Sequence, residues 1–178
     1  MDGFGIPGLD ILLHPNGRMR MQDQNRIRYL NSIAHVTKST TQTISNNTWT
    51  VVTFDIEEFD PDNMHSLVTN TSRLTARITG KYIAACCLSF AANSTANRKL
   101  TIEKNSAGTE TALNIVGMNS TFGSTIGSTF MAVNAVTPMV AGDYVELFAY
   151  QNSGGNLGID GIDTWGHVTF LALIYVGE

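Results

Sequence analysis

The C-terminal part of the chain contains two segments that would be apolar on both faces of a β-strand, residues 142–150 (GDYVELFAY) and 167–176 (HVTFLALIYV). Successive side chains of a strand point to opposite faces. In the second segment one face carries Val168, Phe170, Ala172, Ile174 and Val176, and the other carries Leu171, Leu173 and Tyr175. One face can pack into the core of the same chain, but the other needs cover from elsewhere, and a second subunit is the simplest source. The pattern therefore predicts an assembly.

Short alternating segments predict β-strands along most of the remaining chain. They cover residues 33–39, 49–59, 73–78, 81–92, 98–105, 110–118 and 127–140. No segment of helical length keeps a 3.6-residue period, and the regular spacing of strands and turns is typical of an antiparallel sandwich or jelly roll. Residues 1–32 lack a clean period. We expect one all-β domain over residues 33–178, preceded by an irregular N-terminal extension over 1–32.

The amino-acid composition narrows the range of functions that the chain can have. Only 15% of the residues are charged, the net charge is −4, and no basic block is interleaved with aromatic residues, which argues against nucleic-acid binding. The apolar runs are too short to span a bilayer and the N-terminus lacks a signal-peptide pattern, so we expect no membrane insertion. Adjacent Cys86 and Cys87 point to opposite faces of their predicted strand and make a poor disulfide. Free thiols are consistent with folding in a reducing cytoplasm.

Residues 55–63 (DIEEFDPDN) concentrate carboxylates, and the candidate calcium ligands are Asp55, Glu57, Asp60 and Asp62. The stretch lacks the glycine and the closing glutamate of an EF-hand loop, and a solvated strand face is the simpler interpretation. A metal site on a threefold axis could instead use His35 or His167. Since the sequence has no nucleophile elbow and no phosphate-binding glycine loop, we do not expect the chain to be an enzyme.

The glycine-rich loop 151–166 is the candidate ligand-binding segment. Trp165 follows glycines and aspartates, and an exposed tryptophan can stack on a sugar ring, with Asn152 and Asp160 beside it as polar partners. Aromatic residues in a β-sandwich are more often part of the core or of an interface, and that alternative stays open. No sequence feature identifies the glycan.

The order of strands and turns resembles the C1q/TNF-like jelly-roll superfamily, and most of all the short C1q-like proteins of bacteriophages and bacteria. The matching stretches are 46–65 (NNTWTVVTFDIEEFDPDNMH), 72–85 (SRLTARITGKYIAA), 100–105 (LTIEKN), 141–154 (AGDYVELFAYQNSG) and 170–177 (FLALIYVG). The resemblance implies a homotrimer around a threefold axis. The positions that it assigns to the trimer contact are Tyr82, Tyr144, Phe148, Phe170 and Leu173. The collagen-like stalk of longer members is replaced here by the N-terminal extension.

Two functions follow from these expectations. The first is a non-enzymatic structural protein at a bacteriophage virion surface, a trimeric decoration, fibre or tail-associated knob made and folded in the host cytoplasm. Its N-terminal segment would bind a capsid or tail protein through apolar anchor residues, namely Phe4, Ile6, Leu9, Ile11 and Leu12. The second is a receptor-binding or lectin-like module for host-surface glycan. An enzyme such as a glycan hydrolase would need a pair of carboxylates in a groove.

Overall fold

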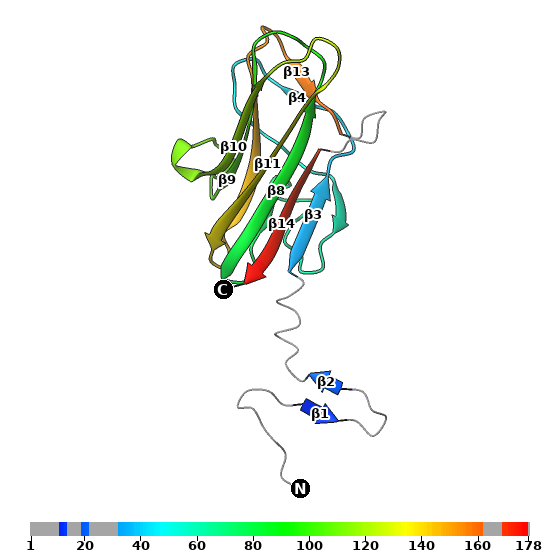
Figure 1. Cartoon of the computed structure of the whole chain (residues 1–178), viewed down its shortest axis with the longest axis vertical. Coiled ribbons are helices and arrows are strands. Elements are labelled where there is room, and N and C mark those ends of the chain that lie inside the picture. The colour runs from blue at the N-terminus through cyan, green and yellow to red at the C-terminus, as the bar shows by residue number, and fades with distance from the viewer. Residues whose placement is uncertain (1–10, 14–18, 22–31, 162–168, 178) are drawn as a thin grey trace.

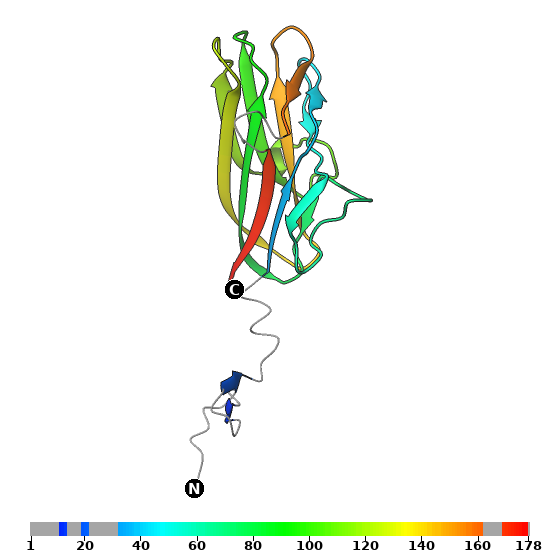
Figure 2. The same ribbon diagram turned by 90° about the vertical axis from the view of Figure 1, so that its right-hand side faces the viewer.

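Two antiparallel β-sheets packed face to face form the domain in the computed structural model (Figure 1). The structure describes residues 11–13, 19–21, 32–161 and 169–177. Within these residues no helix is long and apolar enough to cross a membrane. The two sheets follow the long axis of the domain, as the perpendicular view in Figure 2 shows. The antiparallel sandwich predicted from the strand pattern is confirmed.

The larger sheet has seven strands in the order β4-β13-β8-β14-β3-β6, with β11 paired to β8. The smaller sheet has five, in the order β10-β9-β12-β5, with β7 paired to β12. A separate two-stranded sheet pairs β1 with β2. The strands are β1 (Ile11–Leu13), β2 (Met19–Met21), β3 (Ile33–Thr37), β4 (Gln42–Ile44), β5 (Thr50–Val51), β6 (Ile56–Phe59), β7 (Arg73–Thr75), β8 (Gly80–Phe90), β9 (Asn97–Lys104), β10 (Ile115–Phe122), β11 (Thr129–Met139), β12 (Tyr144–Gln151), β13 (Leu157–Ile159) and β14 (Phe170–Gly177), and a 3-10 turn, η1, covers Ala112–Asn114.

The core lies between the two sheets. Alternate residues of the long strands supply it, as the period of two requires. In β8 these are Tyr82, Ala84, Cys86, Leu88 and Phe90, which face Leu100 and Ile102 of β9 and Val145, Leu147 and Ala149 of β12 across the sandwich. Leu171 and Leu173 of β14 belong to the same cluster. Both apolar C-terminal segments therefore give one of their two faces to the core.

Three parts of the chain differ from the strand prediction. Residues 49–59 form two short strands, β5 and β6, and not one. In the stretch predicted to begin a strand at residue 110, η1 comes first and β10 starts at Ile115. β4 and β13 are only three residues long, too short for an alternation to be recognised. These differences lie at sheet edges and in connections, where tertiary contacts outweigh local pattern.

Candidate functional site

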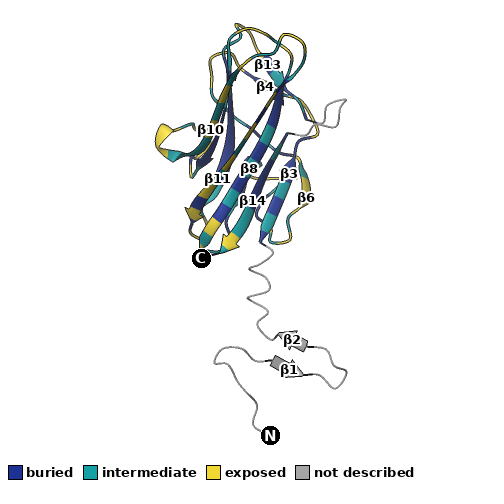
Figure 3. Ribbon diagram, in the orientation of Figure 1, coloured by how far each residue is buried: buried dark blue, intermediate teal, exposed yellow. Residues whose placement is uncertain are grey.

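The outward face of the larger sheet is unusually apolar for a surface. The strand register places Ile33, Ile174, Ile83 and Val136 in one row across β3, β14, β8 and β11. The next row contains His35, Ala172, Ala85 and Asn134, and the one after it Thr37, Phe170, Cys87 and Ala132. Figure 3, viewed onto this sheet, shows buried and partly exposed positions alternating along β8. We call this surface the apolar face; its members are Ile33, His35, Phe59, Ile83, Ala85, Cys87, Phe130, Ala132, Val136, Phe170, Ala172 and Ile174.

The rim of the apolar face carries large side chains that are open to solvent. Phe130 is 45% exposed and Val136 is 69% exposed. Its centre is flatter, because the central row holds two alanines, Ala172 and Ala85. A contiguous apolar surface of this kind is rare on a monomer and is typical of an interaction site.

One ionisable ring lies within this surface. His35 stacks on Phe59 with the ring centroids 5.4 Å apart and lies 5.0 Å from the ring of Phe170. Burial lowers the pKa of His35 below its ordinary value, against a smaller opposing effect from the nearby Glu58 carboxylate. The apolar face therefore favours a neutral imidazole.

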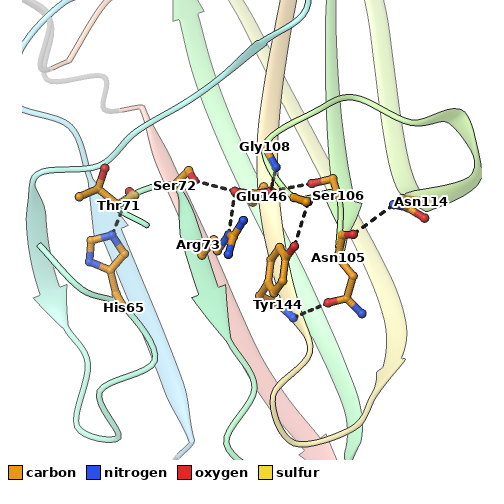
Figure 4. Close-up of polar contacts among 11 residues, drawn as sticks. His65, Thr71, Ser72, Arg73, Asn105, Ser106, Gly108, Asn114, Tyr144 and Glu146 are labelled. Atoms are coloured by element: carbon orange, nitrogen blue, oxygen red, sulfur yellow. Dashed lines mark hydrogen bonds and ion pairs between the residues drawn. The ribbon is translucent and has the colours of Figure 1, made fainter. Parts of the chain in front are cut away.

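The smaller sheet holds a buried carboxylate at the centre of a hydrogen-bond network (Figure 4). Glu146 is 1% exposed. Its Oε1 accepts from the hydroxyl of Ser72 at 2.7 Å and from Nε of Arg73 at 3.1 Å. Its Oε2 accepts from the hydroxyl of Ser106 at 2.7 Å and from the backbone N–H of Gly108 at 2.9 Å. We call these five residues the Glu146 network.

These bonds decide the charge state of the carboxylate. Burial alone would raise the pKa of Glu146, but the hydrogen bonds from Ser106, Ser72, Gly108 and Arg73 outweigh it and lower the pKa. The network thereby fastens the connection between β9 and β10 to the surface of the smaller sheet. It joins side chains that are far apart in sequence.

A second buried carboxylate lies directly opposite the first. Glu103 of β9 pairs with Glu146 of β12 in the strand register and is fully buried. It accepts from the hydroxyl of Thr101 and from the backbone N–H of Thr111, each at 3.0 Å. Burial raises the pKa of Glu103 in spite of these bonds. Carboxylates with pKa values moved apart can divide acid and base roles, but both of these are covered and leave no room for a substrate.

A polar pocket of about 370 Å³ lies beside this network, on the β7 side of the smaller sheet. We call it the arginine pocket. It is lined by Met64, His65, Ser66, Thr69, Asn70, Arg73, Thr75, Arg77, Gly142 and Tyr144. The side chain of His65 is buried, with Nδ1 3.0 Å from Glu57 and Nε2 3.1 Å from the carbonyl oxygen of Thr71. Both ring nitrogens therefore face an acceptor.

The residues that the resemblance assigned to the trimer contact are dispersed. Phe170 lies on the apolar face, whereas Tyr82 and Leu173 point the other way and are fully buried in the core of one chain. Phe148 is 1% exposed and lies on the smaller sheet, between Thr101 and Val51 in the register. Tyr144 lines the arginine pocket. The burial of Tyr82 and Leu173 was not predicted because β8 and β14 are apolar on both faces, and a period of two does not say which face is inward.

The predicted calcium ligands do not converge. Asp55 accepts from the backbone N–H and the hydroxyl of Ser39, both at 2.7 Å. Asp60 accepts from the backbone N–H groups of Met64 and His65 and closes the following turn. Glu57 faces His65, and among the described residues no three His, Cys, Asp or Glu side chains, Asp62 included, form a group that could hold a metal ion. Asp55 and Asp60 act as local caps of the backbone.

Several predicted residues fall outside the described part of the chain: Phe4, Ile6, Leu9, Trp165 and His167. Ile11 and Leu12 lie in β1, paired with Met21 and Arg20. Asn152 accepts through Oδ1 from the backbone N–H of Asn97 at 2.8 Å, which ties the β12–β13 loop to β9. Asp160 donates its backbone N–H to the carbonyl of Ser89.

Sequence reasoning missed the residues that give the arginine pocket its charge. The signal was present, because Arg73, Thr75 and Arg77 alternate with Leu74 and Ala76, which are buried. This alternation places two arginines on the outward side of one edge segment. The outward residues of β8, Ile83 and Cys87, alternate with buried residues in the same way.

Solved structures of other proteins share this fold, although their sequences are very different. No family model and no curated protein sequence matches the chain. Among solved structures, murine APRIL at pH 5.0 matches with a TM-score of 0.59 and 12% identity over 82% of this chain and 98% of that one. The globular domain of zebrafish complement 1qA protein matches with a TM-score of 0.53 and 16% identity over 83% of this chain and 100% of that one. The chain therefore has the C1q/TNF-like jelly-roll fold.

Proposed function

We propose that the chain is a non-enzymatic homotrimeric structural protein of a bacteriophage virion surface, a decoration, fibre or tail-associated knob. The apolar face is the contact between its subunits, and residues 1–32 attach it to a capsid or tail protein. The observation that carries the proposal is the apolar face itself. Its rows of isoleucine, valine and phenylalanine span four adjacent strands with no cover from the same chain in the described residues.

The energetics favour association through this face. Each square ångström of apolar surface removed from water stabilises a contact by roughly 25 cal/mol. Stable interfaces bury about 800 Å² per partner, and the apolar face extends over four adjacent strands. The threefold symmetry is inferred from the resemblance to the C1q/TNF-like superfamily. A closed ring of three subunits would cover the apolar face of every subunit.

Chain geometry supports attachment from one end. Antiparallel pairing places Ile33, at the start of β3, opposite Ile174, near the end of β14, so the domain is entered and left at the same end. The connections at the opposite end would then project outward. The carboxylate pair Glu103–Glu146, the arrangement closest to a hydrolase site, is buried, which supports a non-enzymatic role.

A matched pair of substitutions tests the assembly. Ile174→Asp places a charge on the apolar face, whereas Ile126→Asp makes the same change at a residue that is 97% exposed in the β10–β11 connection. We expect sedimentation velocity at micromolar concentration to show a monomer for Ile174→Asp and a trimer for Ile126→Asp. A trimer for both variants would refute the proposed contact.

The virion location is tested on particles. We expect mass spectrometry of purified phage particles encoding this chain to find it as a stoichiometric component. Particles produced from a gene in which the segment 1–32 is deleted should not contain the chain. If the chain is absent from intact particles, the virion role is wrong even when the trimer forms.

A receptor-binding module for host-surface glycan is the second candidate, and the arginine pocket favours it. It is concave, polar and on the sheet opposite the apolar face, so the proposed trimer contact does not use it. The two candidates are compatible, because a virion knob can also bind a receptor. Glycan binding by the glycine-rich loop is tested separately, by comparing the wild type with Trp165→Ala on a glycan array. Binding by this loop predicts a loss of signal in the variant.

A further inference from the structure

The arginine pocket contains one arginine whose orientation is fixed from two sides. Nε of Arg73 donates to Glu146, and the guanidinium carbon lies 4.1 Å from the centroid of the Tyr144 ring. The Tyr144 hydroxyl accepts from the backbone N–H of Ala107 at 2.9 Å, and the Tyr144 backbone N–H donates to Asn105, so the ring is also held (Figure 4). Since the guanidinium is already ordered, a ligand that binds it loses little further side-chain entropy.

This arrangement leaves the end of the Arg73 fork available. Its Nη groups have no hydrogen-bond partner among the described residues. Glu146 has three donors besides Arg73, so the arginine is not needed to satisfy it. A buried carboxylate thus acts as a support that positions a half-exposed cation.

A second arginine, Arg77, lines the same pocket. Arg77 is exposed, and among the described residues its guanidinium has neither a hydrogen bond nor an ion pair. Arg73 is matched by Glu146, and His65 is bonded to Glu57. Arg77 therefore places a cation without an ion-pair partner among the described residues in the lining of the pocket, in a chain whose net charge is −4.

The lining of the pocket also offers neutral polar groups. Asn70 is exposed with its side-chain amide unpaired within the described residues, and the hydroxyls of Ser66 and Thr69 lie 3.4 Å apart. Together with the partly exposed Tyr144 ring they resemble the lining of a carbohydrate site, where hydroxyls need donors and acceptors and the ring needs a flat surface. Small-molecule sites span about 300–1,000 Å³, so a pocket of about 370 Å³ suits one acidic sugar residue and part of its neighbour.

We propose that the arginine pocket binds an anionic sugar, with the acid group between Arg73 and Arg77 and the sugar hydroxyls at Asn70, Ser66 and Thr69. An arginine fork matches both a planar carboxylate and a sulfate. This inference specifies the glycan-binding candidate above and is independent of the trimer. A protein carboxylate fits the two arginines equally well but does not use the hydroxyl-bearing rim.

Three probes on one scaffold separate the sources of the charge. Calorimetry at about 0.15 M salt compares 3′-sialyllactose, lactose 3′-sulfate and neutral lactose with the wild-type chain. We expect at least one charged sugar to bind about tenfold or more tightly than lactose, since a charge-assisted hydrogen bond contributes about 1.5–3 kcal/mol. Preference for the carboxylate or for the sulfate identifies the acid group. Equal binding of all three sugars, or no binding of any, overturns the proposal.

Two charge-removing variants locate the site. Arg77→Gln should weaken the binding of the charged sugars about tenfold and leave lactose binding unchanged, because the arginine has no partner to lose within the described part of the chain. Lys99→Gln removes the same charge elsewhere on the smaller sheet, over the ring of Tyr150, and should bind as the wild type does. An equal loss in both variants would mean nonspecific attraction and contradict the pocket. Sedimentation of each variant separates failure of the pocket from failure of the trimer.

Discussion

Replacing Glu146 with glutamine removes the negative charge at the centre of the Glu146 network while keeping the size of the side chain. The carboxylate accepts four hydrogen bonds, two on each oxygen. Glutamine keeps one oxygen, and its NH₂ group then faces two groups that donated before. Whichever way the amide turns, either Arg73 or the backbone N–H of Gly108 loses its acceptor.

The cost follows from those lost bonds. A hydrogen bond to a charged group contributes about 1.5–3 kcal/mol. Two are lost, and the hydroxyl of Ser72 or Ser106 recovers part of the loss by rotating to accept from the new NH₂ group. We therefore expect Glu146→Gln to lower the free energy of unfolding by about 2–4 kcal/mol, a large share of the 5–15 kcal/mol that is usual for a domain.

Urea unfolding at neutral pH and at one fixed protein concentration measures the effect, since the stability of an oligomer depends on concentration. Glu103→Gln is the matched control, because Glu103 is equally buried and lies directly opposite in the register. Its pKa is raised by burial, so the site does not favour its charge, and a glutamine can accept from the N–H of Thr111 through its oxygen and donate to the hydroxyl of Thr101 through its NH₂ group; we expect a much smaller loss of stability. Equal destabilisation by both substitutions would refute the different roles given to the two carboxylates.

The pH dependence has a defined sign. The pKa of Glu146 is lowered in the folded chain, so its contribution is fully present above the ordinary value of 4.5 and is lost as the pH falls through the lowered pKa. Glu103 behaves in the opposite way, because the cost of its ionisation disappears as the pH falls through its raised pKa. Wild type and Glu146→Gln should therefore converge in stability in acid, and a constant difference down to low pH would contradict the charge assigned to Glu146.

Three further predictions concern other parts of the domain. The pKa of His35 is already lowered by burial in the single chain, and a subunit packed over it would disfavour the charged form further, so the trimer should weaken as the pH falls through that lowered pKa, whereas sedimentation of His35→Gln over the same pH series should show little change. Gly123→Ala should be destabilising by urea unfolding, because its new Cβ would lie 1.9 Å from a backbone oxygen, whereas Gly127→Ala meets nothing within 4 Å and should be tolerated. Cys87 lies on the apolar face, so maleimide labelling should be slow in the wild-type trimer and fast in Ile174→Asp; equal rates would place the contact elsewhere.

The all-β sandwich could be predicted from the sequence because short apolar or alternating segments recur between turns and no segment keeps a helical period. Residues 81–92 and 127–140 correspond closely to β8 and β11, and their turns carry glycine or short polar residues. The assembly was predicted from the two-sided C-terminal segments, and β14 does place Leu171 in the core and Ile174 outward. What the alternation cannot show is which apolar face is inward, since both satisfy the same pattern.

The candidate sites were harder to predict because their residues meet only in three dimensions. The Glu146 network joins side chains from 72 to 146, and Glu146 itself stands within an apolar run where a charge is unexpected (VELF). The acidic run at 55–63 was conspicuous in sequence, yet its carboxylates point to separate local partners. Local clustering of one residue type did not identify a site here, and the single charge inside a core strand was not used as a signal.

The central claim is that the apolar face holds three copies of the chain together, and the molar mass of the wild type in solution tests it most directly. Light scattering after size exclusion, over a dilution series down to about one micromolar, should give three times the 19.3 kDa mass of one chain at every loading. A mass of one chain at micromolar concentration would contradict the account.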